Sequence, residues 1–342
     1  MGDVQTPGRT RRRHWTRSGA LVAATVGLVT VLTACVPPPA PGPEVRPQPP
    51  DRGSVPGVDV APSAGCAVAG RPPTGRSLMT VETEQGHRQA VLDLPPEAQG
   101  STPLPVLLSL HPFTLQANVW DAYSGLAAAG TKRGYIVLTP FGSQPGPRWA
   151  VPGGLDTGID DIAFLSAALD QIEDTACVDR NAEFSAGFSA GAAMSQALSC
   201  TLPWRMTAVA ASGGSNLTDL CPAAPGTSVM ILHGSADPIA PTSGSDVVFA
   251  PPLGIPVDDV VATDAARAGC APAPDTATLF PTVAVDRYVD CDAGLVIEYW
   301  RLIGAGHTWA GAPSLIDFIT GPTNTAISAN ERILDFFDAH RS

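Results

Sequence analysis

The sequence predicts an α/β domain built on a mostly parallel sheet with helices on both faces. Short apolar runs typical of buried strands alternate with longer segments that have helical spacing. Residues able to carry chemistry follow several of these runs, at the edge where the carboxyl ends of parallel strands bind ligands in open α/β folds. About 275 residues follow a proline-rich start, which is enough for one such domain with a large core.

The first half of the domain opens with a predicted hairpin, in which two strands are joined at residues 85–87. A short apolar run bounded by prolines then predicts a buried strand, and an alanine-rich segment predicts a helix that ends near Gly134. In chain order the expected elements are strands at 79–84, 88–94 and 105–110, a helix at 118–132, a strand at 135–139, a loop at 140–156 and a helix capped by Asp160.

The second half continues the alternation of strands and helices. A weak strand precedes a helix rich in strong helix formers, and an amphipathic helix closes the chain. The expected elements are strands at 182–186, 206–211, 228–232 and 295–302 and helices at 192–200, 259–268 and 327–339. This alternation implies strands that run mostly in parallel, because each helix returns the chain to the same end of the sheet.

The start of the chain has the features of an export signal. Five arginines precede an apolar run at residues 20–32, which is too short for a bilayer span of about 20 apolar residues. Thr33, Ala34 and Cys35 follow directly, in a pattern that resembles a bacterial lipobox. We therefore expect residues 1–34 to be a signal peptide and Cys35 to carry a lipid anchor at the outer face of the cell membrane. An ordinary secretory signal, with release to the medium, is the alternative.

A proline-rich segment separates this signal from the folded domain. Residues 35–65 should form an extended tether, because ten prolines and few large apolar residues cannot bury a core. The folded domain would then span residues 66–342. Without residues 1–34 the chain has 15 basic against 31 acidic residues, a net charge of −16. Such an acidic chain, with Lys132 as its single lysine, argues against nucleic-acid binding.

Six cysteines remain when Cys35 is set aside, and an even number in an exported chain indicates three disulfides. Fifteen pairings are possible, and spacing favours Cys200–Cys221, Cys270–Cys291 and, by what remains, Cys66–Cys177. Loops of roughly 20 residues would each contribute about 3 kcal/mol. The sequence has no Cys-x-x-Cys or His-Glu-x-x-His pattern, so it gives no support for a metal site.

The most specific motif is the Gly-x-Ser-x-Gly pentapeptide at residues 187–191. It has the form of a nucleophile elbow, a sharp strand-to-helix turn that holds a serine hydroxyl above a sheet. Gly187 and Gly191 suit so tight a turn because a side chain there would collide with backbone. A serine hydroxyl is a poor nucleophile without a base, and the base needs a third group to orient it. Ser189 is therefore the candidate nucleophile.

The candidate base is His307, which lies in a glycine-rich loop between the last strand and the last helix. Such a loop can deliver an imidazole to the carboxyl edge of the sheet. His111 and His233 each follow an apolar strand, where a histidine that braces a turn is the simpler interpretation. The other histidines lie in the signal, in the opening hairpin and near the C-terminus, and these are His14, His87 and His340.

The candidate acid is Asp237, which follows the strand at 228–232 and precedes Pro238. Serine, aspartate and histidine then occur in the chain order of α/β-hydrolase triads. Other downstream aspartates have structural interpretations, either as a solvated helix face or as part of a cysteine-bearing loop. These are Asp258, Asp259 and Asp264 on the helix and Asp286, Asp290 and Asp292 around the loop.

An acyl-transfer site also needs backbone N–H donors for the oxyanion. The amide of Ala190 follows the nucleophile, and the second donor should come from the loop after the strand at 105–110. Pro112 has no N–H, so Phe113 is the better candidate. Trp149 and Trp309 lie in loops near the expected site and are candidates for an aromatic substrate wall or, equally, for local packing.

These motifs together resemble the polyhydroxybutyrate depolymerase and feruloyl esterase group of α/β-hydrolases. The resemblance spans roughly residues 78–340 and rests on the segments 160–161, 164–165, 177–179, 187–191, 232–238 and 304–309. It implies an α/β-hydrolase fold and a cofactor-free serine esterase with Ser189, Asp237 and His307 as its triad. We expect a monomer that acts on a small-molecule or polymeric ester of feruloyl, acetyl or short-chain hydroxyalkanoate type.

Two departures from this family pattern concern the surroundings of the triad. The family usually has His-Gly where this chain has His111-Pro112, and Trp-Pro-Gly where it has Trp309-Ala310-Gly311. The first leaves the second oxyanion donor open. A serine peptidase on the same fold and a catalytically silent binding protein of the cell envelope are the alternative functions.

Overall fold

The computed structural model describes residues 61–143, 148–154, 158–244, 254–314 and 317–341. The chain divides into two compact units, Met1–Pro50 and Asp51–Ser342. The predicted signal peptide, the lipidation site Cys35 and most of the tether lie outside the described residues. All structural statements below concern the second unit.

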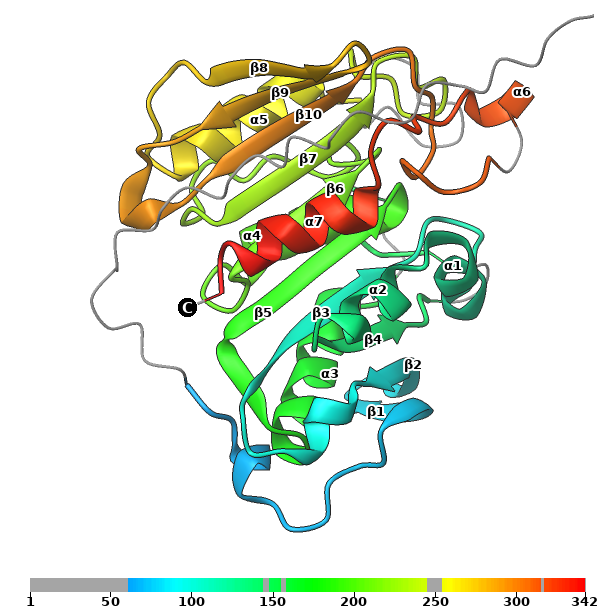
Figure 1. Ribbon diagram of the computed structural model, residues 1–342, viewed down its shortest axis with the longest axis vertical. Coiled ribbons are helices and arrows are strands. Elements are labelled where there is room, and N and C mark those ends of the chain that lie inside the picture. The colour runs from blue at the N-terminus through cyan, green and yellow to red at the C-terminus, as the bar shows by residue number, and fades with distance from the viewer. Residues whose placement is uncertain (1–60, 144–147, 155–157, 245–253, 315–316, 342) are drawn as a thin grey trace, which may run out of the picture. The chain divides into compact units, whose positions relative to one another are not determined.

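A single ten-stranded sheet organises this unit (Figure 1). Its five central pairings are parallel, and the pairs at both ends of the sheet are antiparallel. In sheet order the strands are β1 (Gly75–Thr83), β2 (Gly86–Leu94), β4 (Ile136–Pro140), β3 (Leu104–Leu110), β5 (Val178–Phe188), β6 (Ala208–Ser212), β7 (Ser228–Gly234), β10 (Ile297–Leu302), β9 (Val283–Tyr288) and β8 (Asp275–Phe280).

Helices cover both faces of the sheet and bury two apolar clusters against it. One cluster includes apolar side chains of α3, α4 and α5, and the other includes those of α1, α2 and α7. The helices are α1 (Ala117–Ser124), α2 (Leu126–Lys132), α3 (Asp161–Thr175), α4 (Ala190–Thr201), α5 (Val257–Arg267), α6 (Asp317–Thr320) and α7 (Ala329–Asp338), with short 3-10 turns at Ala64–Ala67, Pro96–Gln99 and Asp292–Gly294. The predicted mostly parallel sheet with helices on both faces is therefore confirmed.

The central strands β3, β4, β6 and β7 are buried along their whole length. Strands covered on both faces read as continuous apolar runs, which is why these were visible in the sequence. Because β3, β5, β6, β7 and β10 run in parallel, their carboxyl ends meet at one edge of the sheet. The loops after these strands carry the candidate site residues to that edge.

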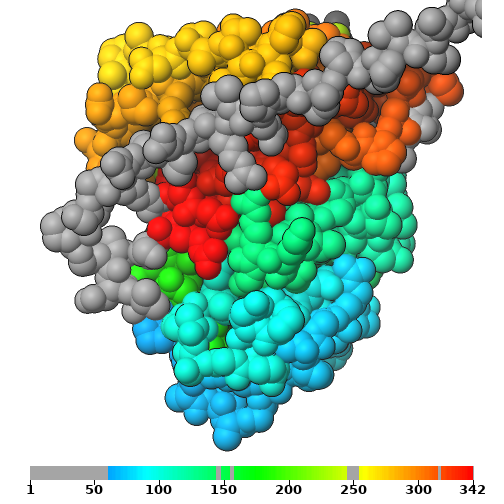
Figure 2. Space-filling model, viewed as in Figure 1, coloured from blue at the N-terminus to red at the C-terminus, as the bar shows by residue number. Residues whose placement is uncertain are grey.

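The closing helix α7 packs beside α2, as Figure 2 shows for the red and green atoms of this face. Arg133, just after α2, donates hydrogen bonds to Glu331, Asp335 and Asp338 of α7. The hydroxyl of Tyr135 donates to Asp338 at 2.8 Å. These contacts join the C-terminal helix to the first half of the domain.

The structure differs from the sequence-based expectations in three places. The helix expected at 118–132 is two helices, because Gly125 has a φ of 65° and interrupts the helical backbone. The antiparallel hairpin β8–β9 was not predicted. The folded domain also begins before residue 66, because Pro62 pairs with Asp179 and the Ser63 hydroxyl donates to the Ala176 carbonyl at 2.9 Å.

The three predicted disulfides are all present. Cys66–Cys177 joins the start of the domain to the beginning of β5, across 111 positions of sequence. Cys200–Cys221 and Cys270–Cys291 each span 21 positions. Such bonds persist in oxidising compartments, which agrees with an exported chain.

Candidate active site

Ser189 lies at the turn between β5 and α4 with φ 54° and ψ −118°, a backbone conformation rarely adopted by a residue with a side chain. Its amide donates to the Ser212 carbonyl at 2.9 Å, and its carbonyl accepts from Ala193 at 3.0 Å. These bonds to β6 and to α4 hold the strained residue in place. Although Ser189 occupies the N-cap position, its hydroxyl makes no capping hydrogen bond. The hydroxyl is thus left available for chemistry.

The elbow glycines are required by close backbone contact. A Cβ added to Gly187 would lie 2.2 Å from the Gly191 carbonyl oxygen, and one added to Gly191 would lie 2.1 Å from the Leu110 carbonyl oxygen. Both distances are far below van der Waals contact, and both neighbours are backbone atoms. From the sequence we expected a side chain at these positions to collide with backbone, and the structure shows that collision.

We expect Gly191→Ala to lower the free energy of unfolding by about 1–3 kcal/mol or more, because the methyl group displaces the end of β3. A decrease in the free energy of unfolding would be informative, because alanine in place of glycine normally stabilises a helix by up to about 1 kcal/mol. Urea unfolding measures the change, with Gly100→Ala as control, because its added Cβ meets no atom closer than 3.1 Å. Equal stability of the two variants would contradict this account of the elbow.

Asp237 and His307 are in direct contact. The carboxylate Oδ2 of Asp237 lies 2.7 Å from Nδ1 of His307, and both side chains are buried. Asp237 follows β7, and its Oδ1 accepts from the amides of Ile239 and Ala240 at 2.8 Å each. His307 lies in the loop after β10, where its amide donates to the Thr320 carbonyl at 2.6 Å. Each side chain is therefore held by its own loop.

The surroundings of Asp237 favour its ionised form. Burial raises the pKa of Asp237, but the nearby imidazoles of His233 and His307 outweigh burial and hold that pKa well below its usual range. An ionised carboxylate only accepts hydrogen bonds, so Nδ1 of His307 carries the proton. Nε2 is then the free acceptor of the ring, as a general base requires.

Ser189 lies in the same neighbourhood as this pair. The ring of Phe188, the residue before Ser189, lies 4.8 Å from the His307 ring between centroids. A Cβ added to Gly213 would lie 3.5 Å from His307 Nδ1 and 3.7 Å from Asp237 Oδ2, and one added to Gly214 would lie 2.2 Å from the Ser189 carbonyl oxygen. Two consecutive glycines after β6 thus pack against all three candidate residues.

Among the contacts of the described residues, no hydrogen bond joins the Ser189 hydroxyl to the His307 imidazole. Catalytic hydrogen bonds are often long in the free enzyme and tighten when substrate binds. The direct contact is therefore between the candidate acid and the candidate base, and the elbow places the candidate nucleophile near them.

The predicted oxyanion donors lie at the N-terminus of α4 and in the turn after β3. Ala190 is the first residue of α4, so its N–H has no intrahelical partner. The backbone of Gly191 packs on Leu110 and His111, which brings the turn that contains Phe113 beside the elbow. The Phe113 side chain is 51% exposed, and Thr114 next to it has a φ of 71°.

His111 is fully buried and braces the turn after β3, in agreement with the simpler sequence interpretation. Its Nε2 accepts from the Gly142 amide at 2.8 Å, and its Nδ1 donates to the Pro112 carbonyl at 2.9 Å. Burial lowers the pKa of His111 to about 4, so the ring is neutral. The ring therefore acts as a fixed bridge between two loops.

Both candidate aromatic wall residues are buried. Trp149 is 6% exposed and donates from its indole to the His111 carbonyl at 2.8 Å. Trp309 is 1% exposed, donates to the Asn330 side chain at 2.9 Å and packs edge-on against Trp120. These contacts favour the local-packing interpretation for both indoles.

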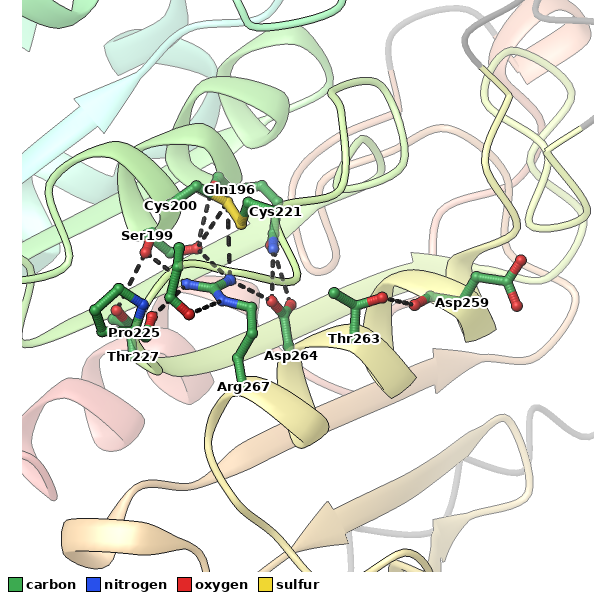
Figure 3. A network of polar contacts seen from close by, with 11 residues as sticks. Gln196, Ser199, Cys200, Cys221, Pro225, Thr227, Asp259, Thr263, Asp264 and Arg267 are labelled. Atoms are coloured by element: carbon green, nitrogen blue, oxygen red, sulfur yellow. Dashed lines mark hydrogen bonds and ion pairs between the residues drawn. A yellow bond between two sulfur atoms is a disulfide. The ribbon is translucent and has the colours of Figure 1, made fainter.

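A buried polar network anchors the far half of α4 (Figure 3). Asp264 of α5 accepts from the Gln196 amide at 2.8 and 3.0 Å and from Arg267 at 2.8 Å. Arg267 also donates to the Ser199 carbonyl at 2.7 Å, beside the disulfide of Cys200. The helix that begins at the elbow is thus tied to α5 at its other end.

The position of Asp264 corrects a sequence-based expectation. We expected this residue on a solvated helix face with Asp258 and Asp259, which are indeed exposed. Asp264 is instead buried, and burial raises its pKa to about 6 against the lowering effects of Arg267 and Gln196. Helical periodicity places it on the inner face, but an ionisable residue there is rare without a partner.

Within the described ranges, no cluster of histidine, cysteine or acidic side chains is arranged to hold a metal ion. The helices of that part of the chain are also too short or too polar for any one of them to cross a membrane.

Comparison with known proteins places the chain near fungal esterases, although no family model matches it. Feruloyl esterase D of Neurospora crassa is 29% identical over 190 residues, which cover 52% of this chain and 62% of that protein. Feruloyl esterase B of Piromyces equi is 27% identical over 246 residues, 68% of this chain and 45% of that protein. The chain spans less than two thirds of the length of these relatives. The predicted resemblance to the feruloyl esterase group is confirmed.

Solved structures agree on the fold. An acetyl xylan esterase from Aspergillus awamori superposes with a TM-score of 0.55 at 16% identity, covering 77% of this chain and 99% of that chain. A dipeptidyl aminopeptidase IV, described as putative, from Bacteroides ovatus gives a TM-score of 0.51 at 13% identity and covers 77% of this chain and 35% of that one. At these identities the likeness shows the fold alone, and it confirms the predicted α/β-hydrolase fold.

Proposed function

We propose that this protein is an exported serine esterase that hydrolyses carboxylic esters through Ser189, His307 and Asp237. The observation that carries the proposal is the 2.7 Å contact between Asp237 Oδ2 and His307 Nδ1 beside a strained serine elbow. Structural ion pairs are common in proteins, but a buried acid–imidazole pair packed beside a serine with φ 54° is the arrangement that nucleophilic catalysis needs.

The reaction follows from the roles that the geometry allows. Ser189 Oγ would attack the ester carbonyl while His307 Nε2 takes its proton, and Asp237 would stabilise the resulting imidazolium. His307 would then protonate the leaving alcohol. Water, activated by the same imidazole, would attack the acyl-enzyme, release the carboxylic acid and restore Ser189. The Ala190 amide, with Phe113 as second candidate donor, would stabilise the oxyanion in both steps.

For the substrate we propose feruloyl or acetyl esters, with short-chain hydroxyalkanoate esters as a further class. The curated relatives carry the name feruloyl esterase, and the superposed structure is named acetyl xylan esterase. The protein would need no cofactor, because the triad and backbone amides supply the chemistry described above. It would act as a monomer.

A panel of substrates tests this proposal against the alternatives. The purified chain should hydrolyse p-nitrophenyl acetate and methyl ferulate and leave peptide p-nitroanilides intact. Turnover of anilides in preference to esters would instead support a serine peptidase, because the same triad can serve amide and ester chemistry. Absence of turnover in every assay would support a silent binding protein of the cell envelope.

We further propose that Cys35 carries a lipid that anchors the protein to the outer face of the cell membrane, with residues 35–65 as tether. This part of the proposal rests on the sequence around the cysteine, and the three disulfides support an extracytoplasmic location.

Cys35→Ala should release the protein from membranes, because Cys35 would carry the lipid and no helix among the described residues can cross a membrane. Fractionation of a bacterial host that processes lipoproteins, followed by immunoblotting, measures this. Ser54→Ala is a matched control that also introduces alanine into the tether but leaves Cys35 in place. Membrane retention of the Cys35→Ala protein at the wild-type level would refute the anchor.

A further inference from the structure

Asp237 is contacted by a second imidazole besides that of His307. His233 lies on β7, four positions before Asp237, and its Nε2 lies 3.5 Å from the same oxygen, Oδ2, that faces His307. Both side chains of this second pair are fully buried. The spacing His-x-x-x-Asp was present in the sequence, but it could not show that the turn folds the two side chains together.

The proton on His233 can be placed from its partners. Nε2 lies 2.8 Å from the Ala240 carbonyl oxygen, which only accepts, so Nε2 carries a proton. Nδ1 is buried and has no hydrogen-bond partner among the described residues. A proton on Nδ1 would bury an unpaired N–H and a charge, which is costly. His233 is therefore a neutral ring that presents one fixed donor.

His233 completes a small ring of contacts around the carboxylate, in which two links are hydrogen bonds through Ala240 and the third is the 3.5 Å approach of Nε2 to Oδ2. The Ala240 amide donates to Asp237 Oδ1, and the Ala240 carbonyl accepts from His233, whose Nε2 also faces Oδ2. The ring fixes both the backbone after β7 and the plane of the carboxylate. With Oδ1 held by two amides, Oδ2 is left to face His307.

We propose that His233 is a positioning residue that holds the Asp237 carboxylate in line with Nδ1 of His307. For activity this inference rests on the proposed esterase function, although the arrangement itself can be measured without turnover. A misplacement of about 1 Å in a catalytic group can cost on the order of 10²-fold in rate. Loss of the donor should therefore slow the chemical step and leave substrate binding nearly unchanged.

Two variants of the full chain separate donation from packing. His233→Leu removes the donor at similar volume, whereas His233→Gln can place an amide N–H near the position of Nε2. We expect kcat for p-nitrophenyl acetate to fall about 10- to 100-fold in His233→Leu with KM within about threefold, and to stay within a few-fold of wild type in His233→Gln. His340→Leu, which removes an imidazole near the C-terminus, is the control.

A spectroscopic measurement decides the inference independently of activity. The Nδ1 proton of His307, held at 2.7 Å from the carboxylate, should give a downfield ¹H NMR resonance. This resonance should persist in His233→Gln and shift or broaden in His233→Leu. If His233→Leu does not fold, His233→Asn replaces it, because its amide is too short to reach the Ala240 carbonyl.

The outcomes separate this inference from the proposed function. An unchanged resonance in His233→Leu or its replacement, or equal loss of kcat in the Gln and Leu variants, would overturn the positioning role. A wild-type protein that hydrolyses no ester would sink the esterase proposal, while the resonance would still test the positioning of Asp237.

Discussion

Ser189→Ala should lower kcat for ester hydrolysis by about 10⁴- to 10⁶-fold, because it removes the atom that forms the acyl-enzyme. The fold should remain intact, since the Ser189 hydroxyl makes no capping bond to α4 and the strained backbone is held by Ser212 and Ala193. Alanine tolerates this conformation little worse than serine. Steady-state kinetics on p-nitrophenyl acetate measure the loss, and circular dichroism checks the fold.

Ser195→Ala is the matched control for this variant. Ser195 lies six positions further along α4, where its hydroxyl hydrogen-bonds Ser185 at 2.9 Å in the buried core. It has no place in the proposed chemistry, so its kcat should stay near that of the wild type. A fall of only a few-fold in Ser189→Ala would mean that another group is the nucleophile.

Asp237→Asn should lower kcat by about 10³- to 10⁴-fold. The carboxylate accepts hydrogen bonds at both oxygens, two from backbone amides at Oδ1 and one from His307 at Oδ2, and the His233 imidazole approaches Oδ2 at 3.5 Å. An asparagine amide would present N–H to one of these sets and disfavour the His307 tautomer in which Nε2 is free. Although burial raises the pKa of Asp237, its two imidazole partners hold that pKa well below its usual range, so the wild-type carboxylate is ionised at neutral pH.

The control for Asp237→Asn is Asp258→Asn, which removes the same charge from the exposed face of α5. It should leave kcat within about twofold of wild type. If Asp237→Asn retained more than about a tenth of wild-type kcat, the contact between Asp237 and His307 would be structural rather than catalytic.

Strands that the helices bury on both faces were the most predictable part of the fold. In β3, β4, β6 and β7 the apolar runs are continuous, so their positions follow from composition. β8 has no such signal, because Asp275–Phe280 is an edge strand with almost every side chain exposed. Its pairing with β9 is determined by tertiary structure and leaves no periodic apolar pattern.

The candidate site was predictable where residue type and turn chemistry coincide. The elbow glycines and Ser189 follow from a steric requirement that is local in sequence. The contact between Asp237 and His307, 70 positions apart, was a hypothesis from chain order and from the position of each residue in a loop after a predicted strand. The burial of Trp149 and Trp309 could not be predicted from the sequence. A tryptophan in a loop has the same sequence context whether it lines a site or packs beneath it.

For His233, the sequence predicted one of its contacts but not the other. Its position after an apolar strand predicted a histidine that braces a turn, and its hydrogen bond to Ala240 fits that role. Its approach to Asp237 depends on how sharply the chain turns after β7, which residue types do not reveal. The second role of such a residue can therefore be found only when side chains are placed.

Covalent labelling tests most directly whether this site is a working nucleophile and base. The purified protein should react with a fluorophosphonate probe, and peptide mapping should place the adduct on Ser189 alone. The adduct should vanish in Ser189→Ala and form far more slowly in His307→Ala, because the imidazole takes the serine proton. An unlabelled wild-type protein, or an adduct on any other residue, would contradict the proposed mechanism.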